Sequence, residues 1–479
     1  MKKSNILKFL LIAAATVAFM ACDDLIQVEP QQSVSAEVAT QSSTGILAVY
    51  NRGYRAQMFS GYWGLRMVMA GDVLADNGVS NPNNSGRWTG EPINQFGSGV
   101  GGWGRYSGIN DLNTVIKHAP TVDGFTDNER SRVLGETLAL RALAYHDLVK
   151  VYGYEPNKIV DGWDRGVILR TEPTETIDAA DFRSRASVTA VYEQIEADLL
   201  QSINLLTQTD GNAPFYMNRA AAHALLARVY LYWERWDDAI EHATFAIQQS
   251  PVSVVGPGAV GPEMYAAEPN PESLFELKFT SSESLGVNIA LSSALTPNVW
   301  LDVLPSEELL ATFAPEDVRN SLYPLAEENY EDVIGTSNEG RRYVAKYEAT
   351  VATHTDNVPV IRISEVFLTR AEAYAERGEP GDDVLANNDL NEIRTNRGLT
   401  AYAVPPLDLV EEILLERRRE LAFEGHRWQD LKRKGWDVVK PAATGPSPTL
   451  VFGESVQFLS QLPNGEVSLN PNLEQNPGY

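Results

Sequence analysis

Apolar side chains recur at helical spacing over long stretches of this chain. Residues 130–153 and 187–206 carry apolar positions three or four apart, which places them on one face of an α-helix. Ser187 stands where a helix N-cap belongs, because its hydroxyl can accept a hydrogen bond from a free backbone N–H group. Residues 44–59 are expected to form a further helix. The stripe in the first segment consists of Leu138, Ala142, Tyr145 and Val149. These segments predict a mainly α-helical fold.

Residues 225–251 predict two antiparallel helices of the tetratricopeptide type, in which small side chains let the helices approach closely. The matching positions are Leu226, Ala227, Tyr230, Trp236, the small stripe Ala239, Ala243 and Ala246, and Pro251. Residues 368–380 and the segment after them predict a weaker second pair, and residues 135–153 with 187–206 a third. The spacing between the pairs is irregular, so we expect a tetratricopeptide-like scaffold with insertions and no uniform solenoid.

Two long segments lack a periodic pattern. Residues 71–104 are rich in Gly, Asn and Ser, which predicts a long loop. Residues 252–360 contain short pieces that are strand-like or irregular, such as 273–279 and 341–349, so a few short strands are expected. We therefore predict one domain over residues 46–479, in which scaffold segments at about 105–250 and 360–440 alternate with insertions at about 60–104 and 252–360 that carry the ligand-binding loops.

The amino-terminal segment has the pattern of a lipoprotein signal peptide. Three lysines precede about a dozen apolar or small residues, a stretch too short to span a bilayer. The stretch ends at Cys22, the single cysteine of the chain, so no internal disulfide can form. Residues 19–22 resemble a bacterial lipobox, whose cysteine takes up lipid; the alternative is an ordinary signal peptide with an unrelated cysteine. We expect a signal peptide over residues 1–21 and a lipidated flexible tether over 22–45.

Charge and motifs exclude several classes of function. The chain has 64 acidic and 39 basic residues and a net charge of −25, which disfavours nucleic acid as a partner. The six histidines form no HxxxH or HxH pair, and we find no nucleotide-binding or nucleophile motif, so no metal site, cofactor or catalytic residue is predicted. A glycoside hydrolase would need two carboxylates across a cleft, which sequence alone does not exclude. Structural calcium near Asp72, Asp76 and Asn77 lacks EF-hand spacing and is unsupported.

An arginine-rich segment near the carboxyl end predicts a structural helix with internal ion pairs. Residues 411–435 carry seven Lys or Arg and six Asp or Glu, so the segment is nearly neutral. On one helix, Arg417 would lie on the same stripe as Glu420 and Glu424. We therefore expect a partly buried Arg–Glu network here and no nucleic-acid interface.

An ordered series of motifs runs nearly from end to end of the chain. The segments are GETLALRALAYHDLVKVYG, RASVTAVYEQIEADL, NRAAAHALLARVYLY, VPVIRISEVFLTRAEAYAERG, LNEIRTNRGL, LLERRRELAFEGHRWQDLKR and LNPNLEQNPGY. In sequence and order they resemble the SusD/RagB family of outer-membrane nutrient-binding lipoproteins. Residues 395–396, Thr-Asn, depart from the Arg-Ala pair frequent in that family.

The resemblance implies a SusD-like fold and a role in nutrient capture. The tetratricopeptide-like half would dock on a SusC-like TonB-dependent transporter barrel, and the protein would act as a hinged lid at the cell surface, anchored in the outer membrane by lipid. The ligand would be a glycan or a peptide, and no enzymatic activity is implied. The shared motifs belong to the scaffold, so their charged residues are expected to have a structural role. These residues are Arg141, Arg362, Glu365, Glu372, Arg417 and Glu424.

The ligand-binding residues cannot be carried over from the family motifs, so they are chosen as polar and aromatic side chains expected to be exposed in loops. Indole faces suit the C–H faces of sugars, and carboxylate, amide and guanidinium groups suit hydroxyls. The candidates are Trp63, Asp72, Asp76, Asn77, Arg87, Trp88 and Trp300. A repeat-scaffold lipoprotein that binds only protein partners is the alternative, and the tryptophans in the loops speak against it.

Overall fold

The computed structural model describes residues 39–95, 97, 99–175, 178–207, 214–328, 330–347, 353–445 and 449–479. The predicted signal peptide, the lipid-bearing Cys22 and most of the predicted tether lie outside these residues and stay predictions. Within the described ranges, no helix is both long enough and apolar enough to cross a membrane. The regular structure is mainly helical, which confirms the predicted fold class.

The helices begin and end as follows. The first half contains α3 (Ser43–Gln57), α4 (Arg66–Leu74), α5 (Tyr106–His118), α6 (Asp127–Tyr152), α7 (Val188–Leu205), α8 (Arg219–Tyr232) and α9 (Trp236–Gln249). The second half contains α10 (Pro262–Ala266), α11 (Leu291–Leu295), α12 (Glu307–Leu310), α13 (Ile363–Arg377), α14 (Asp382–Asn396), α15 (Leu409–Glu420), α16 (Arg427–Lys434) and α17 (Asn464–Leu469). The strands are β1 (Gly78–Ser80), β2 (Ser273–Leu277), β3 (Val303–Pro305) and β4 (Val358–Arg362).

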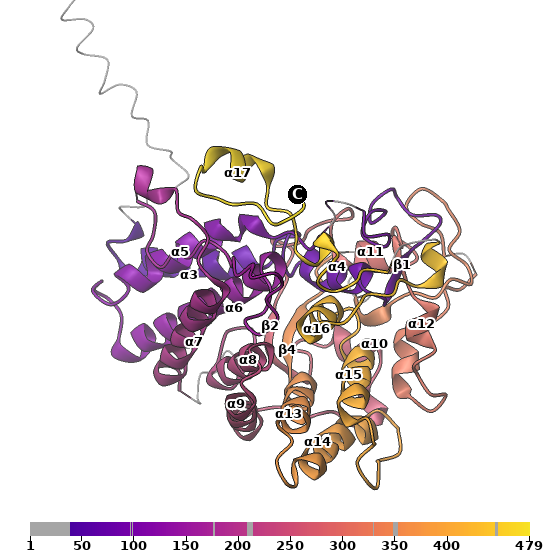
Figure 1. The fold of residues 1–479 in the computed structure, drawn as a ribbon. Coiled ribbons are helices and arrows are strands. Elements are labelled where there is room, and N and C mark those ends of the chain that lie inside the picture. The colour runs from indigo at the N-terminus through magenta and orange to yellow at the C-terminus, as the bar shows by residue number, and fades with distance from the viewer. Residues whose placement is uncertain are drawn as a thin grey trace, which may run out of the picture.

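The scaffold consists of helix pairs that pack one after another. Helix α6 packs on α7, α8 on α9 and α13 on α14, and α13 also packs on α9, which joins the two halves of the chain (Figure 1). Small side chains allow the close contact between α8 and α9, because Ala239, Ala243 and Ala246 are fully buried. Ser187 accepts a hydrogen bond from Ala190 N at 3.1 Å, so the predicted N-cap of α7 is confirmed. The arrangement is compatible with tetratricopeptide-like pairing.

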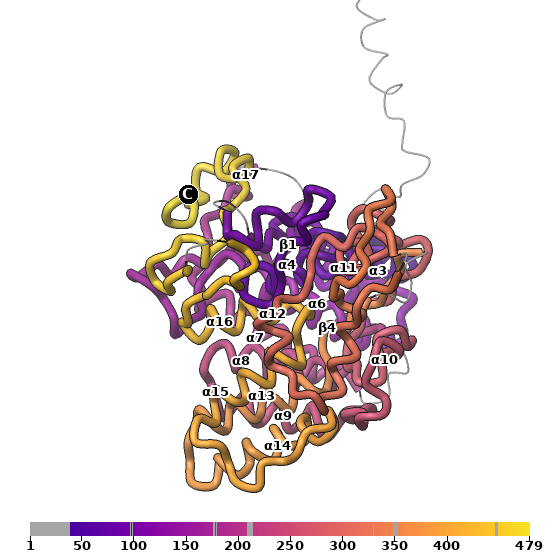
Figure 2. Tube along the Cα trace, turned by 90° about the vertical axis from the view of Figure 1, so that its right-hand side faces the viewer, coloured from indigo at the N-terminus to yellow at the C-terminus, as the bar shows by residue number. Residues whose placement is uncertain are grey.

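The two insertions meet in a second region, where α4, β1 and α11 lie together at the opposite end from α14 (Figure 2). Strand β1 pairs antiparallel with β3, with Val79 opposite Leu304, so the two insertions share one ladder. Strand β2 pairs antiparallel with β4 through a bulge, and both strands are buried. The strand predicted within residues 273–279 is therefore present. These pairings fix the insertions against the helical scaffold.

One prediction for the insertions was wrong in detail. Residues 71–104 are not loop throughout, because α4 continues to Leu74 and β1 follows. Packing against distant segments overrides the local composition there. The described part of residues 341–349, expected to be strand-like or irregular, contains a short 3₁₀ turn at Ala345–Tyr347, and the partner of β2 is β4.

A buried ionic network joins α15 to β4 and the loops around them. The Arg362 guanidinium contacts Glu272 at 2.7 Å, Glu420 at 2.9 Å and Glu424 at 2.7 Å, and its side chain is 1% exposed. Arg397 adds contacts of 2.8 Å to Glu272 and to Glu420. Although burial opposes it, these guanidinium groups hold the pKa of Glu420 well below its usual range. The network is a structural centre of the scaffold.

The predicted single helix over the arginine-rich segment is broken. Helix α15 ends at Glu420, a turn of residues 421–425 follows, and α16 begins at Arg427. Arg417 therefore pairs with Asp430 at 3.3 Å and lies 3.8 Å from Glu372, and it makes no ion pair with Glu420. The expected internal Arg–Glu network exists, but with different partners.

The family-derived structural residues all lie in the core as ion-pair partners. Arg141 binds Asp198 at 2.7 Å, and Glu365 binds Arg228 at 2.5 Å. Glu372 accepts two hydrogen bonds from Arg433, at 2.6 and 2.7 Å. All six of the residues that the family motifs mark as structural are buried, which confirms their structural role: Arg141, Arg362, Glu365, Glu372, Arg417 and Glu424.

The carboxyl-terminal segment returns to the amino-terminal helices. The Asn476 side chain, 1% exposed, donates to the carbonyl oxygens of Tyr152 at 3.1 Å and Ser460 at 2.7 Å. Arg185 Nη1 donates to Asn476 Oδ1 at 2.8 Å and Arg185 Nη2 to the Tyr152 carbonyl at 2.7 Å. The last residues thus close the end of α6, near the point marked C in Figure 1.

Candidate ligand-binding site

A groove of about 370 Å³ lies where the two insertions meet. Its walls come from the segment that leads into α4, the loop after β1, and the chain from just before α11 to just before β3. The lining residues are Ser60, Gly61, Leu65, Arg66, Arg87, Trp88, Asn288, Ile289, Ala290, Ala294 and Asp302. The groove therefore combines two guanidinium groups, an indole, an amide and a carboxylate.

The β1–β3 ladder brings the walls together. Directly after β1, Asn81 N donates to the carbonyl of Asp302 at 2.9 Å, and Asn81 Nδ2 donates to the carbonyl of Leu301 at 2.8 Å. The loop then turns back, so that Ser80 Oγ donates to the Trp88 carbonyl at 2.7 Å. Trp88 adopts a left-handed backbone conformation with φ of +53°, which is strained for a side chain of its size. These contacts fix Arg87 and Trp88 opposite the segment before β3.

Each arginine of the groove is paired with one carboxylate and lies over one indole. Arg87 Nε is 3.3 Å from Asp302 Oδ2, and its guanidinium carbon lies 5.0 Å from the centre of the Trp300 ring. Arg66 Nη2 is 2.8 Å from Glu91 Oε1, and its guanidinium carbon lies 5.2 Å from the Trp88 ring. The two positive charges are balanced locally, so the groove is neutral overall.

Two buried donors lack a hydrogen-bond partner among the described residues. Arg87 Nη2 belongs to the groove lining, whereas Trp300 Nε1 belongs to a residue that contacts Arg87 but does not itself line the groove. The other terminal nitrogen, Arg87 Nη1, donates to the Asn288 carbonyl at 2.6 Å, so the guanidinium is held in place. Because an unpaired buried donor is costly, these groups are suited to binding oxygen atoms of a ligand.

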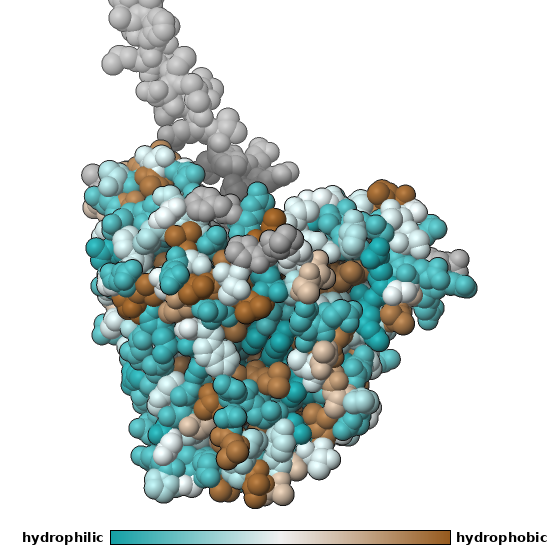
Figure 3. Space-filling model, turned by 45° about the vertical axis from the view of Figure 1, so that its right-hand side comes forward, coloured by the Kyte–Doolittle hydropathy of each residue, from teal (hydrophilic) through white to brown (hydrophobic). Residues whose placement is uncertain are grey.

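Apolar side chains stand exposed in the segments that form the walls. Phe59 is 50% exposed, Ile289 42% and Val287 38%. The surface is otherwise mostly hydrophilic, with apolar side chains in scattered groups (Figure 3). An exposed apolar edge beside fixed polar donors is the composition typical of small-ligand sites.

Three of the predicted ligand residues, Arg87, Trp88 and Trp300, are brought together here; Arg87 and Trp88 line the groove, and Trp300 lies against Arg87. The expected exposure of Trp88 was wrong, because its side chain is buried at 8% exposure and little of its ring is accessible. Sequence reasoning missed Arg66, Asn288 and Asp302. Asp302 stands two residues after Trp300 and could have been found by that proximity, whereas no local signal marks the other two.

The expected exposure of Trp63, Asp72 and Asn77 was wrong. Trp63 is 2% exposed, and its Nε1 donates to Asp147 Oδ2 at 2.8 Å. Asp72 and Asn77 are fully buried and bonded to each other, with Asn77 Nδ2 donating to Asp72 Oδ1 at 2.7 Å. The cause is that the segment before α4 and the helix itself pack into the core. None of these three side chains reaches the groove.

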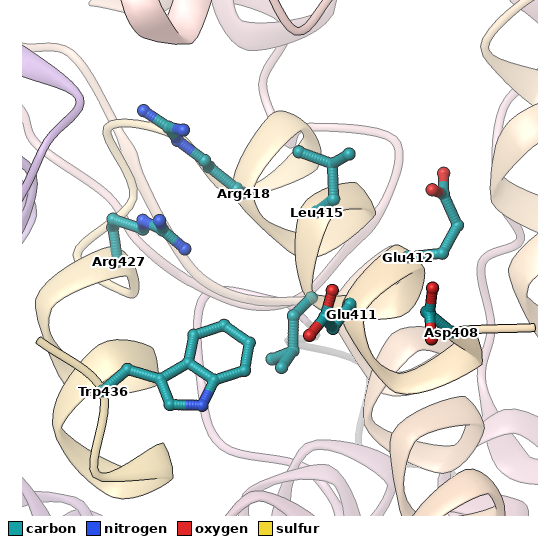
Figure 4. A pocket seen from close by; sticks show the side chains of 8 residues that line it. Asp408, Glu411, Glu412, Leu415, Arg418, Arg427 and Trp436 are labelled. Atoms are coloured by element: carbon teal, nitrogen blue, oxygen red, sulfur yellow. The ribbon is translucent and has the colours of Figure 1, made fainter.

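Asp76 lies outside the groove, and it pairs with Arg418 and Arg427, which line a second cavity of about 520 Å³ between α15 and α16. It accepts two hydrogen bonds from Arg427, at 2.7 and 2.8 Å, and lies 3.3 Å from Arg418. Figure 4 shows these arginines on one side of the cavity with Trp436, and Asp408 and Glu412 on the other. Asp76 therefore already engages the two arginines that line this cavity.

Two family models match this chain over both halves of its scaffold. The model of the SusD family matches residues 314–479. A second model, described as starch-binding and associating with the outer membrane, matches residues 40–231. This is a SusD-like protein. The resemblance read from the motifs is thereby confirmed, and the family is one of binding proteins.

Individual SusD-family proteins extend the match over the whole chain. SusD-like protein P2 of Formosa agariphila is 26% identical, with 100% of both chains covered. The starch-binding protein SusD of Bacteroides thetaiotaomicron is 32% identical over 137 residues, 27% of this chain and 23% of that protein. The crystal structure of a SusD superfamily protein from Bacteroides thetaiotaomicron has a TM-score of 0.79 at 25% identity, covering 91% of this chain and 100% of that one.

Proposed function

We propose that this chain captures a neutral oligosaccharide at the cell surface and passes it to a TonB-dependent transporter of the outer membrane. The observation that carries the proposal is the pair of unpartnered donors, Arg87 Nη2 and Trp300 Nε1, beside an indole-lined groove. Sugar hydroxyls would accept these hydrogen bonds, while the C–H face of the ring would contact the apolar edge. The starch-binding relative and the family description support a glycan as the ligand.

The charges around the groove favour a neutral sugar over an anionic one. Arg66 and Arg87 are each neutralised by a carboxylate, Glu91 and Asp302. No surplus positive charge is left to offset the repulsion that a chain of net charge −25 exerts on an approaching polyanion. A polysaccharide that carries sulfate or uronate groups would therefore bind more weakly than a neutral one.

Capture would proceed by binding alone, with no bond made or broken. The lipid on Cys22 would hold the protein at the membrane, where a short tether beside the transporter raises the effective concentration of ligand at the barrel. A lid can close on its ligand only by the difference in affinity between the closed and open states. Co-purification of an outer-membrane barrel with the lipidated chain tests this step.

Titration of the mature chain without its lipid tests the ligand. Neutral polysaccharides, anionic polysaccharides and a peptide digest are compared by calorimetry, with product formation checked in parallel. We expect saturable binding of one neutral glycan class, no product, and affinity at least about tenfold lower in Arg87→Ala and Trp300→Ala. Trp436→Ala, in the second cavity, serves as the control and should bind normally.

Other outcomes would change the assignment. Binding of peptides alone would keep the family and replace the substrate. Preference for an anionic glycan would contradict the charge argument. If Arg87→Ala and Trp300→Ala bound the glycan as tightly as the parent and the Trp436→Ala control do, the groove would not be the binding site.

A further inference from the structure

The side chains that line the groove between the insertions offer few free hydrogen-bond acceptors. The one carboxylate, Asp302, is 1% exposed, and its oxygens already accept from Ser85 N at 2.8 Å and from Arg87 Nε at 3.3 Å. The side-chain oxygen of Asn288 lies 3.4 Å from Arg87 Nη1. Among the lining residues that the structure describes, the Ser60 hydroxyl is the side-chain oxygen left without a partner.

Two guanidinium groups supply donors to the same groove. Arg66 donates from Nε to the Val100 carbonyl at 3.1 Å and from Nη2 to Glu91 Oε1 at 2.8 Å, so the group is fixed in direction. Its Nη1 has no partner among the described residues, and neither has Arg87 Nη2. A ligand group that accepts without donating suits such a wall, because a hydroxyl that entered here would leave its own proton unpaired.

The rest of the lining is apolar, with short side chains. Ile289 is 42% exposed, and Leu65, Ala290 and Ala294 complete the apolar part. These side chains cannot form a hydrogen bond with a hydroxyl, and covering a hydroxyl against them costs free energy. A methyl group gains free energy at the same place.

We propose that the groove takes an acetyl group carried by the captured sugar. Its carbonyl oxygen would accept from an unpartnered guanidinium nitrogen of Arg66 or Arg87, and its methyl group would pack against Ile289. The inference rests on the proposed function and narrows its ligand from neutral glycans to acetylated ones. A carboxylate also accepts without donating, but each guanidinium already faces a carboxylate, Glu91 or Asp302.

Acetyl groups are attached to sugars in two ways, as an ester on a hydroxyl or as an amide on an amino group. The ester has no proton to donate, whereas the amide N–H needs an acceptor of its own. Because the Ser60 hydroxyl is the side-chain acceptor that remains in the lining, the groove favours the ester.

The test compares matched ligands on the mature chain without its lipid. Oligosaccharides of O-acetylated xylan and of O-acetylated glucomannan are titrated by calorimetry beside the same material de-esterified with mild alkali. The N-acetylglucosamine tetramer is titrated beside cellotetraose, which has a hydroxyl in place of each acetamido group. We expect an esterified oligosaccharide to bind at least about tenfold more tightly than its de-esterified form.

Ile289→Ser tests where the acetyl group lies. This variant should reduce the preference for the esterified form to about threefold or less and leave the affinity for the de-esterified form nearly unchanged, because only the methyl contact is lost. Ile334→Ser is the matched control, since Ile334 is 73% exposed and does not line the groove. It should keep the preference of the parent.

The outcomes separate this inference from the function on which it rests. Equal binding within every matched pair, or tighter binding of the de-esterified forms, would overturn the acetyl group and leave glycan capture standing. A preference that Ile289→Ser does not reduce would overturn its placement in the groove. Tighter binding of the N-acetylglucosamine tetramer alone, lost in Ile289→Ser, would support the acetyl group with the amide as its source. No binding of any neutral glycan would overturn both proposals.

Discussion

Asp72 is a carboxyl group that the fold encloses completely beneath the turn of residues 421–425. Burial raises the pKa of Asp72 to about 6, although backbone groups of Phe423 and Gly425 and the Asn77 side chain hydrogen-bond to it. The ordinary value for an unfolded aspartate is near 3.8. The folded state therefore binds this proton more tightly than the unfolded state does, and the free energy of unfolding falls as pH rises through about 6.

Replacing Asp72 by Asn should remove this pH dependence. Asn keeps an oxygen that can accept the hydrogen bond from Asn77 and has no proton to lose. Relative to the parent, the free energy of unfolding of Asp72→Asn should rise by about 2 kcal/mol between pH 4 and pH 7, because part of the roughly 3 kcal/mol that corresponds to the whole shift falls below pH 4. Urea unfolding at a series of pH values measures it. Exposed Asp123→Asn is the control, and parallel curves for parent and Asp72→Asn would contradict the argument.

Single residues were predicted least well because burial is decided by distant segments. Asp72 and Trp63 occur in a stretch without helical periodicity and carry no local sign of being covered. Arg87, Trp88 and Trp300 were found because residue type alone marks them as suited to sugars. Their neighbours Arg66 and Asn288 were missed, since arginine and asparagine are common on any surface.

The turn between α15 and α16 depends on one glycine. Gly425 has φ of +85°, and a Cβ atom there would lie 2.3 Å from the carbonyl oxygen of Met67 in α4. Neither the backbone conformation nor this approach tolerates a larger residue. Helix α16 is thereby held against α4, which in turn leads into β1 and the groove.

Gly425→Ala should lower the free energy of unfolding by about 3 kcal/mol or more, since strain and a backbone clash add together. Gly378→Ala is the matched control: Gly378 also has a left-handed conformation, with φ of +68°, but no atom lies within 4 Å of its missing Cβ. That variant should lose only about 1 kcal/mol. Denaturant unfolding of Gly425→Ala and Gly378→Ala measures the free energy of unfolding that each variant loses. Similar losses in the two variants would refute a steric role for Gly425.

At the scale of elements, the helix pairs could be predicted because their apolar period is local. The α8–α9 pair follows from its small-residue stripe, and Ser187 marks the start of α7. The break after Glu420 was missed, although Gly425 lies within the segment and glycine is a helix-ending signal. Charge periodicity across residues 411–435 suggested continuity that the packing against α4 does not allow.

For the whole molecule, the groove depends on contacts between insertions far apart in the sequence. Asn81 joins them: its side chain donates to the Leu301 carbonyl, 220 positions away, and to Asn338 Oδ1 at 3.2 Å. Such a pairing leaves no local trace, so the sequence predicted two binding insertions but not their meeting. The order of scaffold segments, in contrast, was predictable because each carries its own motif.

Asn81→Ala should weaken glycan binding without removing any group that contacts the ligand. Loss of the two side-chain hydrogen bonds loosens Arg87 relative to Trp300, and we expect about a fivefold lower affinity, equivalent to about 1 kcal/mol. Calorimetry and thermal unfolding measure the effect. Exposed Asn83→Ala should bind like the parent, and unchanged affinity in Asn81→Ala would show that the groove is organised independently of this contact.

Because of Asn476, packing at the end of α6 is completed only by the last segment of the chain to be synthesised. Ribosomes make the chain from its amino end, so Tyr152 and Arg185 are synthesised long before the side chain that bonds to both. Until residue 476 has emerged, the end of α6 lacks the cover that Asn476 provides, although Arg185 can already donate to the Tyr152 carbonyl. Unfinished or shortened chains are thus left open at the joint between their first and last segments, where proteases and chaperones can distinguish them from the finished protein.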